Sequence, residues 1–457
     1  MKENTDLELM RNFFDTGATK SYDFRRTQLQ KLKDTIKKYE AEIFDALHKD
    51  LRKNKEEAYI SENGFCLSEI SDALKYLSGW MKPKKVSTNW FNFPSKSFLL
   101  AEPLGVVLII SPWNYPFNLL FTPLIGAIAA GNCVVVKPSE MAPATTAITK
   151  KILEEIFDPK YILFTEGDGA TVVPAMMNNF IFDHVFYTGS TAVGKIIYEL
   201  AAKNLVPVTL ELGGKSPCVI ESDADIKVSA KRIAMAKFLN AGQTCVAPDY
   251  LLVQETVKEK IIEAIKENIK LFFGDDAQKS GYFGRIINEK QFERIEKYLI
   301  KSDVILGGKR DKKDLYIEPT LLQISDTNTS VMQEEIFGPV LPIISFANMQ
   351  DALKIIKQNK NPLAFYLFTS SKERENSWLN EVAFGGGCIN NAALQLANEN
   401  LPFGGRGASG IGNYHGKFSF DTFSHKKSVL KTPTWFDPSL KYPPFTNRLN
   451  LFKKVMK

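Results

Sequence analysis

The stretch LGVVLIISPWNYPFNLLFTPLIGAIAAGNCVVVK, residues 104–137, predicts a strand, a helix and a second strand in succession. The runs Leu104–Ile110 and Cys133–Val136 are apolar and rich in β-branched residues, which is typical of strands buried on both faces. Between them, Phe117–Ala130 is apolar and long enough for a helix, and Gly131-Asn132 is a stop signal. This order is that of a parallel β-α-β unit.

The same alternation of strands and helices continues on both sides of this stretch. Apolar residues at helical spacing mark residues 24–47 and 56–80 before it. The alternation predicts an α/β fold with two doubly wound parallel sheets, whose ligands bind beyond the carboxyl ends of the strands. The other expected strands are residues 161–165, 184–187 and 207–211 in a first block, and 216–220, 250–254, 340–345, 363–369 and 387–389 in a second block.

Composition limits the class of protein. The 457 residues suggest two or three domains, with 44% hydrophobic and 24% charged residues, as is ordinary for a globular protein. A net charge of +6, spread along the chain, does not indicate nucleic-acid binding. Five scattered cysteines, no apolar leader and no apolar stretch of ~20 residues favour a cytoplasmic, reducing location. The four histidines lack metal-site spacing, so no metal is expected.

The strongest chemical signal is Cys245, which follows the small and polar run Asn240–Thr244. A core cysteine is usually surrounded by apolar neighbours, whereas a turn of small residues leaves the sulfur open to a substrate. A thiolate can add to a carbonyl carbon and form a covalent intermediate. The run therefore predicts a catalytic cysteine.

Three loops that follow expected strands carry groups suited to ligand binding. Asn114, in a loop stiffened by prolines, offers an amide donor for an oxyanion, although the loop is equally compatible with a plain turn. Lys137 and Glu140 offer a cation and a carboxylate for ribose hydroxyls, or form a surface ion pair. Gly189–Gly194 could bring a pyrophosphate to a helix N-terminus, but its G-x-x-x-x-G spacing also fits a simple helix cap.

Two further segments add candidate groups. Glu211 ends an expected strand before Gly-Gly, where a carboxylate that reaches water near the reacting carbon acts as general base. Otherwise it is a solvated strand end. Downstream, Glu334–Val340 places acidic and aromatic residues before a strand, and Phe403 lies beside Gly-Gly, where it lines a pocket or packs in the core.

Together these motifs resemble the NAD(P)-dependent aldehyde dehydrogenase superfamily in order and spacing. Residues 401–412 and 414–425 are similar to its class 3, or fatty-aldehyde-type, branch. The resemblance extends from about residue 10 to 433. Each motif alone is weak, and their succession is specific. The segments that carry it are residues 111–116, 131–140, 189–194, 211–216, 242–245, 335–339 and 402–405.

The resemblance implies a role for each matching residue. Cys245 is similar to the family nucleophile and Glu211 to its general base. Asn114, with the backbone N–H of Cys245, resembles the oxyanion hole, and Tyr115 and Asn118 are expected to face the substrate. The implied cofactor positions are Trp113, Lys137, Glu140, Gly189, Ser190, Thr191, Ala192, Val193, Gly194, Glu335 and Phe337.

The resemblance also implies three structural parts and a dimer. A dinucleotide-binding domain is expected from residues 1–84 and 104–210, and a catalytic domain from 211–417. A β bridging or oligomerisation element is expected from 85–103 and 418–433, and it builds a homodimer. Residues 434–457 form a basic C-terminal tail.

The expected reaction is oxidation of an aromatic or medium- to long-chain aliphatic aldehyde to the carboxylic acid. Two alternatives remain: a CoA-acylating aldehyde dehydrogenase, which the carboxylate of Glu211 disfavours, and a non-enzymatic membrane-associated protein on the same scaffold. NAD is the expected cofactor because Glu140 suits free ribose hydroxyls, while Lys137 is compatible with NADP. Nothing near Cys245 in the sequence explains how the pKa of its thiol is lowered.

The basic tail carries a separate hypothesis. Residues 448–457 interleave Lys and Arg with Leu, Phe, Val and Met, a pattern compatible with a helix lying on an anionic membrane surface. The expected location is then cytoplasmic with peripheral contact at the inner membrane face. The alternative is a helix that packs on the protein's own dimer.

Overall fold

The computed structural model describes residues 2–455 and contains the strand, helix and strand expected from residues 104–137. They are β3 (Val106–Ile110), α6 (Asn118–Ala130) and β4 (Cys133–Lys137). β3 and β4 pair in parallel, and their side chains are buried throughout. Pro123 lies in α6, in the first turns of the helix, and Gly131 ends it with a left-handed φ of 91°.

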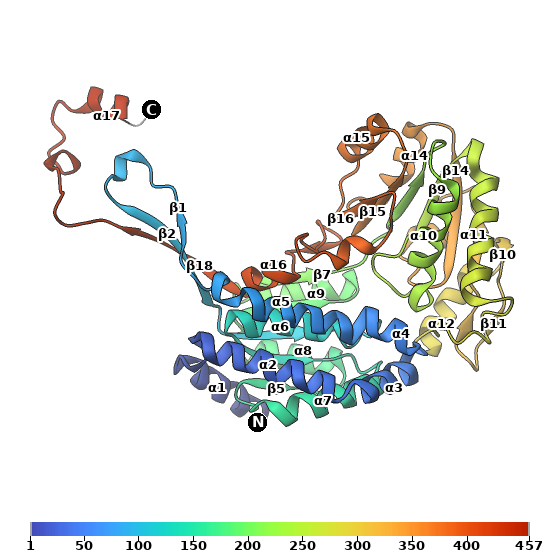
Figure 1. Cartoon of the computed structure of the whole chain (residues 1–457), viewed down its shortest axis with the longest axis horizontal. Helices are drawn as coiled ribbons and strands as arrows, with labels where there is room; N and C mark the ends of the chain where they lie inside the picture. The colour runs from blue at the N-terminus through green and yellow to red at the C-terminus, as the bar shows by residue number, and fades with distance from the viewer. Residues whose placement is uncertain (1, 456–457) are drawn as a thin grey trace.

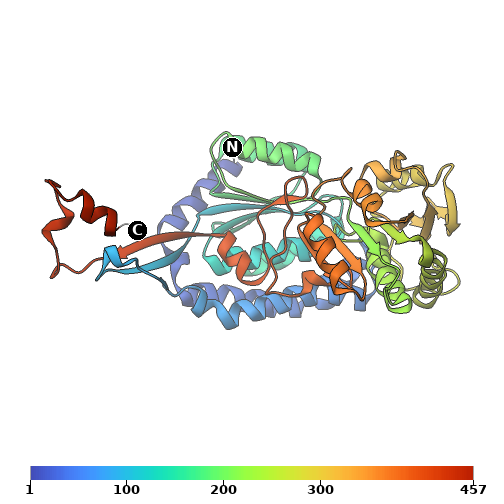
Figure 2. The same ribbon diagram turned by 90° about the horizontal axis from the view of Figure 1, so that it is seen from above.

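The first sheet extends this unit on both sides. Its strand order is β17-β7-β6-β3-β4-β5, and all neighbours are parallel except β17. Helices cover both faces (Figures 1 and 2), with α6 packed on α2 (Tyr22–Lys38) and α5 (Gly64–Trp80), and α8 packed on α1 (Lys2–Asp15) and α9. The bounds are β5 (Ile162–Phe164), β6 (His184–Thr188), β7 (Val208–Glu211), β17 (Gly410–Ile411), α7 (Pro143–Ile156), α8 (Gly169–Asn179) and α9 (Thr191–Ala202).

The N-terminal helices are more broken than the sequence predicts. The expected helix over 24–47 is two helices, α2 (Tyr22–Lys38) and α3 (Glu40–Leu51), because the backbone turns at Tyr39. The expected helix over 56–80 is α4 (Lys55–Ala58), a π-helical turn η2 (Tyr59–Asn63) and α5 (Gly64–Trp80). A further helix, α1 (Lys2–Asp15), precedes them.

The second sheet has the strand order β10-β13-β14-β9-β8-β15-β16 and its own apolar core. The strands expected in this block are present, whereas the antiparallel edge strand β10 and its neighbour β13 were not predicted. The fold is thus α/β with two parallel-sheet layers (Figure 1). The bounds are β8 (Pro217–Ile220), β9 (Tyr250–Gln254), β10 (Asp303–Leu306), β13 (Thr320–Gln323), β14 (Val340–Phe346), β15 (Ala364–Phe368), β16 (Gly386–Ile389), α10 (Ile226–Phe238), α11 (Lys258–Phe273), α12 (Glu289–Glu296), α14 (Met349–Ile356) and α15 (Lys372–Glu381).

A third sheet forms an arm that projects from the first domain (Figure 1). It contains β1 (Lys84–Val86), β2 (Lys96–Pro103) and β18 (Ser424–Lys431), all antiparallel. The β element expected at residues 418–433 includes β18, but its first residues belong to α16 (Gly416–Thr422). Phe420 and Phe423 are buried in the core of the first domain, which explains the helix there.

The exact division into domains stays a prediction. Two contacts show that the chain returns to the first domain after the second sheet. β17 pairs with β7 of the first sheet, and Tyr414 lies in the first core. Residues 410–423 therefore pack on the dinucleotide-binding side, within a span expected to belong to the catalytic and bridging parts.

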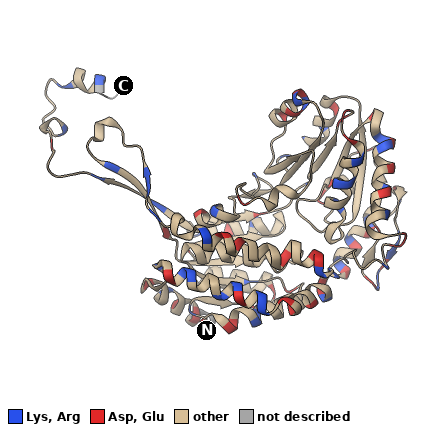
Figure 3. Ribbon diagram, viewed as in Figure 1, with Lys and Arg blue, Asp and Glu red and all other residues tan. Residues whose placement is uncertain are grey.

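The tail follows the arm and ends in α17 (Leu449–Val455). Figure 3 shows Lys and Arg mixed with Asp and Glu over both domains, and further Lys and Arg on the arm and tail. No helix within residues 2–455 is long and apolar enough to cross a membrane. Met456 and Lys457, which belong to the basic tail pattern, lie outside the described residues.

Candidate active site

The carboxyl ends of four neighbouring strands bring the candidate loops together. In the sheet, β7, β6, β3 and β4 are adjacent, and they end at Glu211, Thr188, Ile110 and Lys137. The loops with the Gly189 segment, with Asn114 and with Glu140 therefore follow one another along one edge, as expected for parallel strands.

A cavity of 510 Å³ opens beside this edge and is closed on its other side by the second domain. Ten of its 21 lining residues were predicted as site positions, including Trp113, Asn114, Glu211, Cys245 and Phe337. Gly189, Ser190, Thr191, Ala192 and Glu335 line it too, as do Gln291, Arg294, Leu363, Phe403 and Tyr414. The last five come from segments that meet only in the fold.

The loop before Cys245 is held in an unusual backbone conformation. Asn240, Ala241 and Gly242 have left-handed φ values of 52°, 51° and 75°. A Cβ at residue 242 would lie 2.2 Å from the carbonyl oxygen of Gly338, so a side chain would displace the loop. The small-residue run is thus required by the close approach of two loops.

The Asn114 amide is fixed next to this loop. Its Nδ2 donates to the carbonyl oxygen of Gln243 at 3.0 Å, and the side chain is 2% exposed. An amide nitrogen carries two hydrogens, so one N–H remains for an oxyanion. Gln243 is itself fixed, because its Nε2 donates to Asn240 and Arg285 and its Oε1 accepts from Ile287.

The environment of Cys245 raises the pKa of its thiol. Burial is the largest cause, and the carboxyls of Glu335 and Glu211 add to it by repelling a thiolate. Backbone N–H groups of Cys245 and Val246 act in the opposite direction. The side chain is only partly exposed. The protein's own side chains therefore disfavour the thiolate form of Cys245, which sharpens the question that the sequence left open.

Glu211 is a buried carboxyl at the end of β7. Within the described chain, neither of its oxygens has a hydrogen-bond partner, and the side chain is 2% exposed. Burial raises its pKa well above the usual range. A buried carboxyl without a partner at a cavity wall is suited to take a proton from a water bound there.

Glu335 is the second carboxyl of the cavity. Burial raises its pKa to about 8, and its carboxylate accepts a hydrogen bond from the backbone of Gly214. Gly213 leaves room for this side chain, because a Cβ there would overlap Oε2 of Glu335. Two residues on, Phe337 has a left-handed φ of 47° and packs edge-on against Trp113, with ring centroids 5.3 Å apart.

The Gly189–Gly194 segment forms the start of α9. Ser190 caps the helix by accepting from the backbone of Val193 at 3.4 Å. A Cβ at residue 189 would clash with the Tyr187 hydroxyl, and one at 194 with Leu212. The first four residues line the cavity, whereas Val193 and Gly194 are not among its walls, and their roles stay predictions.

Lys137 and Glu140 lie outside the cavity walls as well. The Lys137 ammonium donates to Glu140 at 3.0 Å and to the carbonyl of Pro138 at 2.7 Å. Both side chains lie close to Gly169 at the start of α8. They are at the expected edge of the sheet, and their contact with a nucleotide stays a prediction.

Tyr115 and Asn118 are tied to the protein. The Tyr115 hydroxyl is 2.6 Å from the Thr244 hydroxyl, next to Cys245. Asn118 donates to the carbonyl of Ser61 and accepts from Thr122. The cavity walls do not include either residue, so their place toward a substrate is untested.

The model of the aldehyde dehydrogenase family matches residues 8–429. The chain belongs to the aldehyde dehydrogenase family. The chain is 47% identical to 4,4'-diaponeurosporen-aldehyde dehydrogenase of Staphylococcus aureus and 43% identical to aldehyde dehydrogenase family 3 member H1 of Arabidopsis thaliana, covering 97% and 98% of this chain and 97% and 93% of theirs.

A solved structure agrees with these matches. The substrate-bound state of Staphylococcus aureus AldH has a TM-score of 0.97 to this chain, at 46% identity and 99% coverage of each chain. This aldehyde dehydrogenase is therefore an enzyme of the class 3 branch, with the α/β fold predicted from the sequence.

Proposed function

We propose that this aldehyde dehydrogenase oxidises its aldehyde to the carboxylic acid through a covalent intermediate on Cys245. The observation that carries the proposal is the convergence in one cavity of a thiol, an amide with a spare N–H and a carboxyl that has no hydrogen-bond partner within residues 2–455. Cys245, Asn114 and Glu211 supply the nucleophile, the oxyanion donor and the base.

The same cavity fits a nicotinamide dinucleotide. The N-terminus of α9 presents backbone N–H groups to it, and Gly189 brings the backbone close, which suits a pyrophosphate. Trp113 and Phe337 supply aromatic faces, and Glu335 is positioned for ribose hydroxyls. When bound, the nicotinamide supplies a hydride acceptor.

The residues act in the following order. The Cys245 thiol releases its proton to solvent and its sulfur adds to the aldehyde carbon. The oxygen that becomes negative is held by the Asn114 amide and the Cys245 N–H. The resulting thiohemiacetal loses a hydride from its carbon and becomes a thioester. Glu211 takes a proton from water, and the hydroxide adds to the thioester carbonyl. The C–S bond then breaks and releases the carboxylic acid. The proton held by Glu211 returns to the sulfur and restores the thiol.

An assay of NADH formation with a panel of aldehydes tests the proposal. The expected result is turnover that requires aldehyde and gives free acid without CoA. Acyl-CoA formation, with no acid in its absence, would favour the CoA-acylating alternative. No turnover of any aldehyde with NAD or NADP would reject the enzymatic reading.

NAD is proposed as the preferred cofactor and NADP as a second one. The Glu140 carboxylate can accept from free ribose hydroxyls, whereas a 2′-phosphate would compete with Glu140 for the Lys137 ammonium. Parallel measurements of kcat/KM for the two cofactors test this order. A higher value for NADP would contradict it.

The proposed substrates are aromatic or medium- to long-chain aldehydes. A second cavity of 750 Å³ has an apolar wall of Ile60, Met235, Leu239 and Phe272. Leu239 begins the turn that leads to Cys245, so this cavity is on the approach to the nucleophile loop. The Staphylococcus aureus relative is named as a dehydrogenase of 4,4'-diaponeurosporen-aldehyde. Kinetics across aliphatic chain length tests the proposal, and equal kcat/KM at every length would contradict it.

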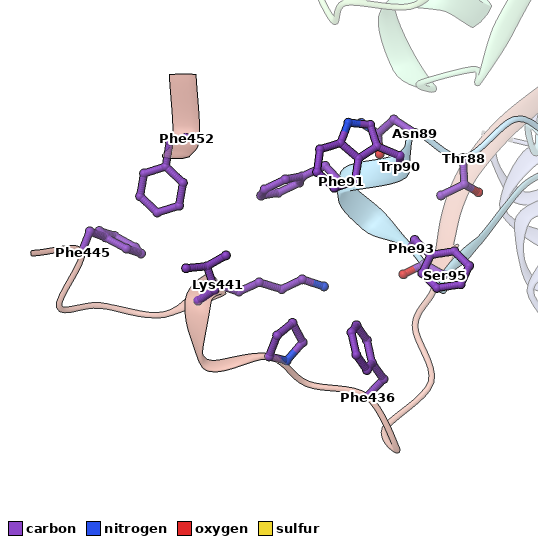
Figure 4. Close-up of a pocket in the computed structure, with 12 residues that line it drawn as sticks. Thr88, Asn89, Trp90, Phe91, Phe93, Ser95, Phe436, Lys441, Phe445 and Phe452 are labelled. Carbon is purple, nitrogen blue, oxygen red and sulfur yellow. The ribbon is translucent and has the colours of Figure 1, made fainter. Parts of the chain in front are cut away.

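A homodimer is proposed through the arm. Aromatic side chains of the 88–95 loop and of the tail surround one apolar hollow of 900 Å³ at the arm tip (Figure 4). Trp90 and Phe93 are 67% and 68% exposed. Exposed aromatic patches of this kind mark interaction sites, and β18 has no second pairing partner in the described chain. A second copy of this chain is the proposed occupant.

Light scattering of the wild type and of Trp90→Ser/Phe93→Ser tests the dimer. The expected result is a dimer for the first and a monomer for the second.

Membrane contact through the tail stays a hypothesis, and the Phe452 ring packs on Phe445 within the tail itself. Sedimentation with anionic vesicles, with and without residues 446–457, tests it, and equal binding would reject it.

A further inference from the structure

A buried group of charged residues lies behind the two catalytic loops. We call it the buried charge cluster; it consists of Lys53, Glu57 and Glu62. Lys53 follows α3, Glu57 lies in α4, and Glu62 lies in the π-helical turn η2. They are 1%, 4% and 0% exposed. π-helical turns in proteins frequently occur at functional sites.

The cluster contacts the Asn114 loop at three backbone groups. The Lys53 ammonium lies 2.5 Å from Oε1 of Glu62 and donates to the carbonyl oxygen of Asn114 at 3.0 Å. The other oxygen of Glu62 accepts from the backbone N–H groups of Phe117 and Asn118, at 3.2 and 2.9 Å. These contacts hold the main chain at Asn114 and shortly after it.

The same cluster contacts the nucleophile loop. Oε1 of Glu57 accepts from the backbone N–H of Asn240 at 2.8 Å. The side-chain amide of Asn240 in turn donates to the carbonyl oxygen of Asn114 at 2.8 Å. The Asn114 carbonyl therefore receives one donor from the cluster and one from the loop that leads to Cys245.

The cluster is close to the reacting groups as well. The Lys53 ammonium lies 3.9 Å from the centre of the Tyr115 ring, and the Tyr115 hydroxyl contacts Thr244, next to Cys245. A buried ion pair is not required for stability alone, because apolar residues of similar volume often replace one without loss. The hydrogen bonds to both loops give this pair a different role.

We propose that the buried charge cluster positions the Asn114 amide relative to the Cys245 thiol. Its members are positioning residues, since they act through the loop backbone. The proposal rests on the oxyanion role given to Asn114 above. Misplacement of a reacting group by about 1 Å costs about 100-fold in rate, so loss of the cluster acts mainly on kcat.

The test uses two double variants of the full-length enzyme. Lys53→Met/Glu62→Leu removes the charges and every hydrogen bond of the pair to the Asn114 loop. Lys53→Met/Glu62→Gln removes the charges but keeps a carbonyl acceptor for the two backbone N–H groups. The control is Arg11→Met/Asp183→Asn, which removes a half-buried ion pair, joined at 2.5 Å, between α1 and the residue directly before β6.

The expected kcat for aldehyde oxidation falls about 100-fold in the Leu variant and about tenfold in the Gln variant, while KM for NAD stays within threefold. The control loses thermal stability with kcat unchanged. If the Leu variant does not fold, the Gln variant decides. Wild-type kcat in whichever variant folds, or equal losses in kcat and cofactor affinity, would overturn the proposal. Absence of turnover in the wild type would instead reject the proposed function.

Discussion

Replacement of Glu211 by Gln gives the sharpest test of the active site. The carboxyl is buried and, among the described residues, without a hydrogen-bond partner, so the substitution removes a base and little packing. General bases contribute about 10²–10⁴ in rate. At about 1.4 kcal/mol per factor of ten, the barrier to thioester hydrolysis rises by about 3–5 kcal/mol. The addition of the thiol and the loss of the hydride do not use Glu211, so the rates of these two steps should not change.

The assay is stopped-flow detection of NADH after mixing with aldehyde and NAD. Glu211→Gln should give one NADH per active site in a burst, followed by steady turnover at least 100-fold slower than in the wild type. Mass spectrometry should then find the acyl group on Cys245. A steady rate within tenfold of wild type, or no burst, would refute the assignment of Glu211 to hydrolysis.

The raised pKa of Glu211 adds a pH dependence with a definite sign. The base is the carboxylate, so thioester hydrolysis in the wild type should increase as pH rises through this pKa. Because the pKa is raised by folding, the unfolded chain releases this proton at lower pH, and the native state loses stability as pH rises. Melting curves should therefore show that Glu211→Gln gains more stability at pH 9 than at pH 5.

Other substitutions test the nucleophile, its loop and the core. Cys245→Ser should abolish aldehyde oxidation while NAD binding, measured by fluorescence titration, remains within threefold. Gly242→Ala should lower kcat at least 100-fold, since a Cβ would lie 2.2 Å from the Gly338 oxygen and φ is 75°; Gly79→Ala, where a Cβ meets nothing within 4 Å, is the control. Leu108→Ala, in β3 at 0% exposure, should destabilise by about 2–5 kcal/mol in urea unfolding, and a loss below about 1 kcal/mol would contradict close packing there.

The sequence alone determined the order of most strands and helices along the chain. Strands such as β3 and β4 are continuous apolar runs, and this pattern does not depend on partners. The small-residue turn before Cys245 was also visible, because a close backbone approach requires glycine wherever it occurs. The edge strand β10 was missed.

Only the tertiary structure decided which side chains share the cavity and what holds them. Tyr414 and Arg294 reach the cavity from segments far from Cys245 in the chain. Lys53 and Glu62 had the spacing of ordinary helix surface charges, and nothing local distinguishes a solvated charge from a buried one. Burial and hydrogen-bond geometry depend on the packing of distant segments, so the buried charge cluster becomes visible only when the α4–η2 segment lies against the Asn114 loop.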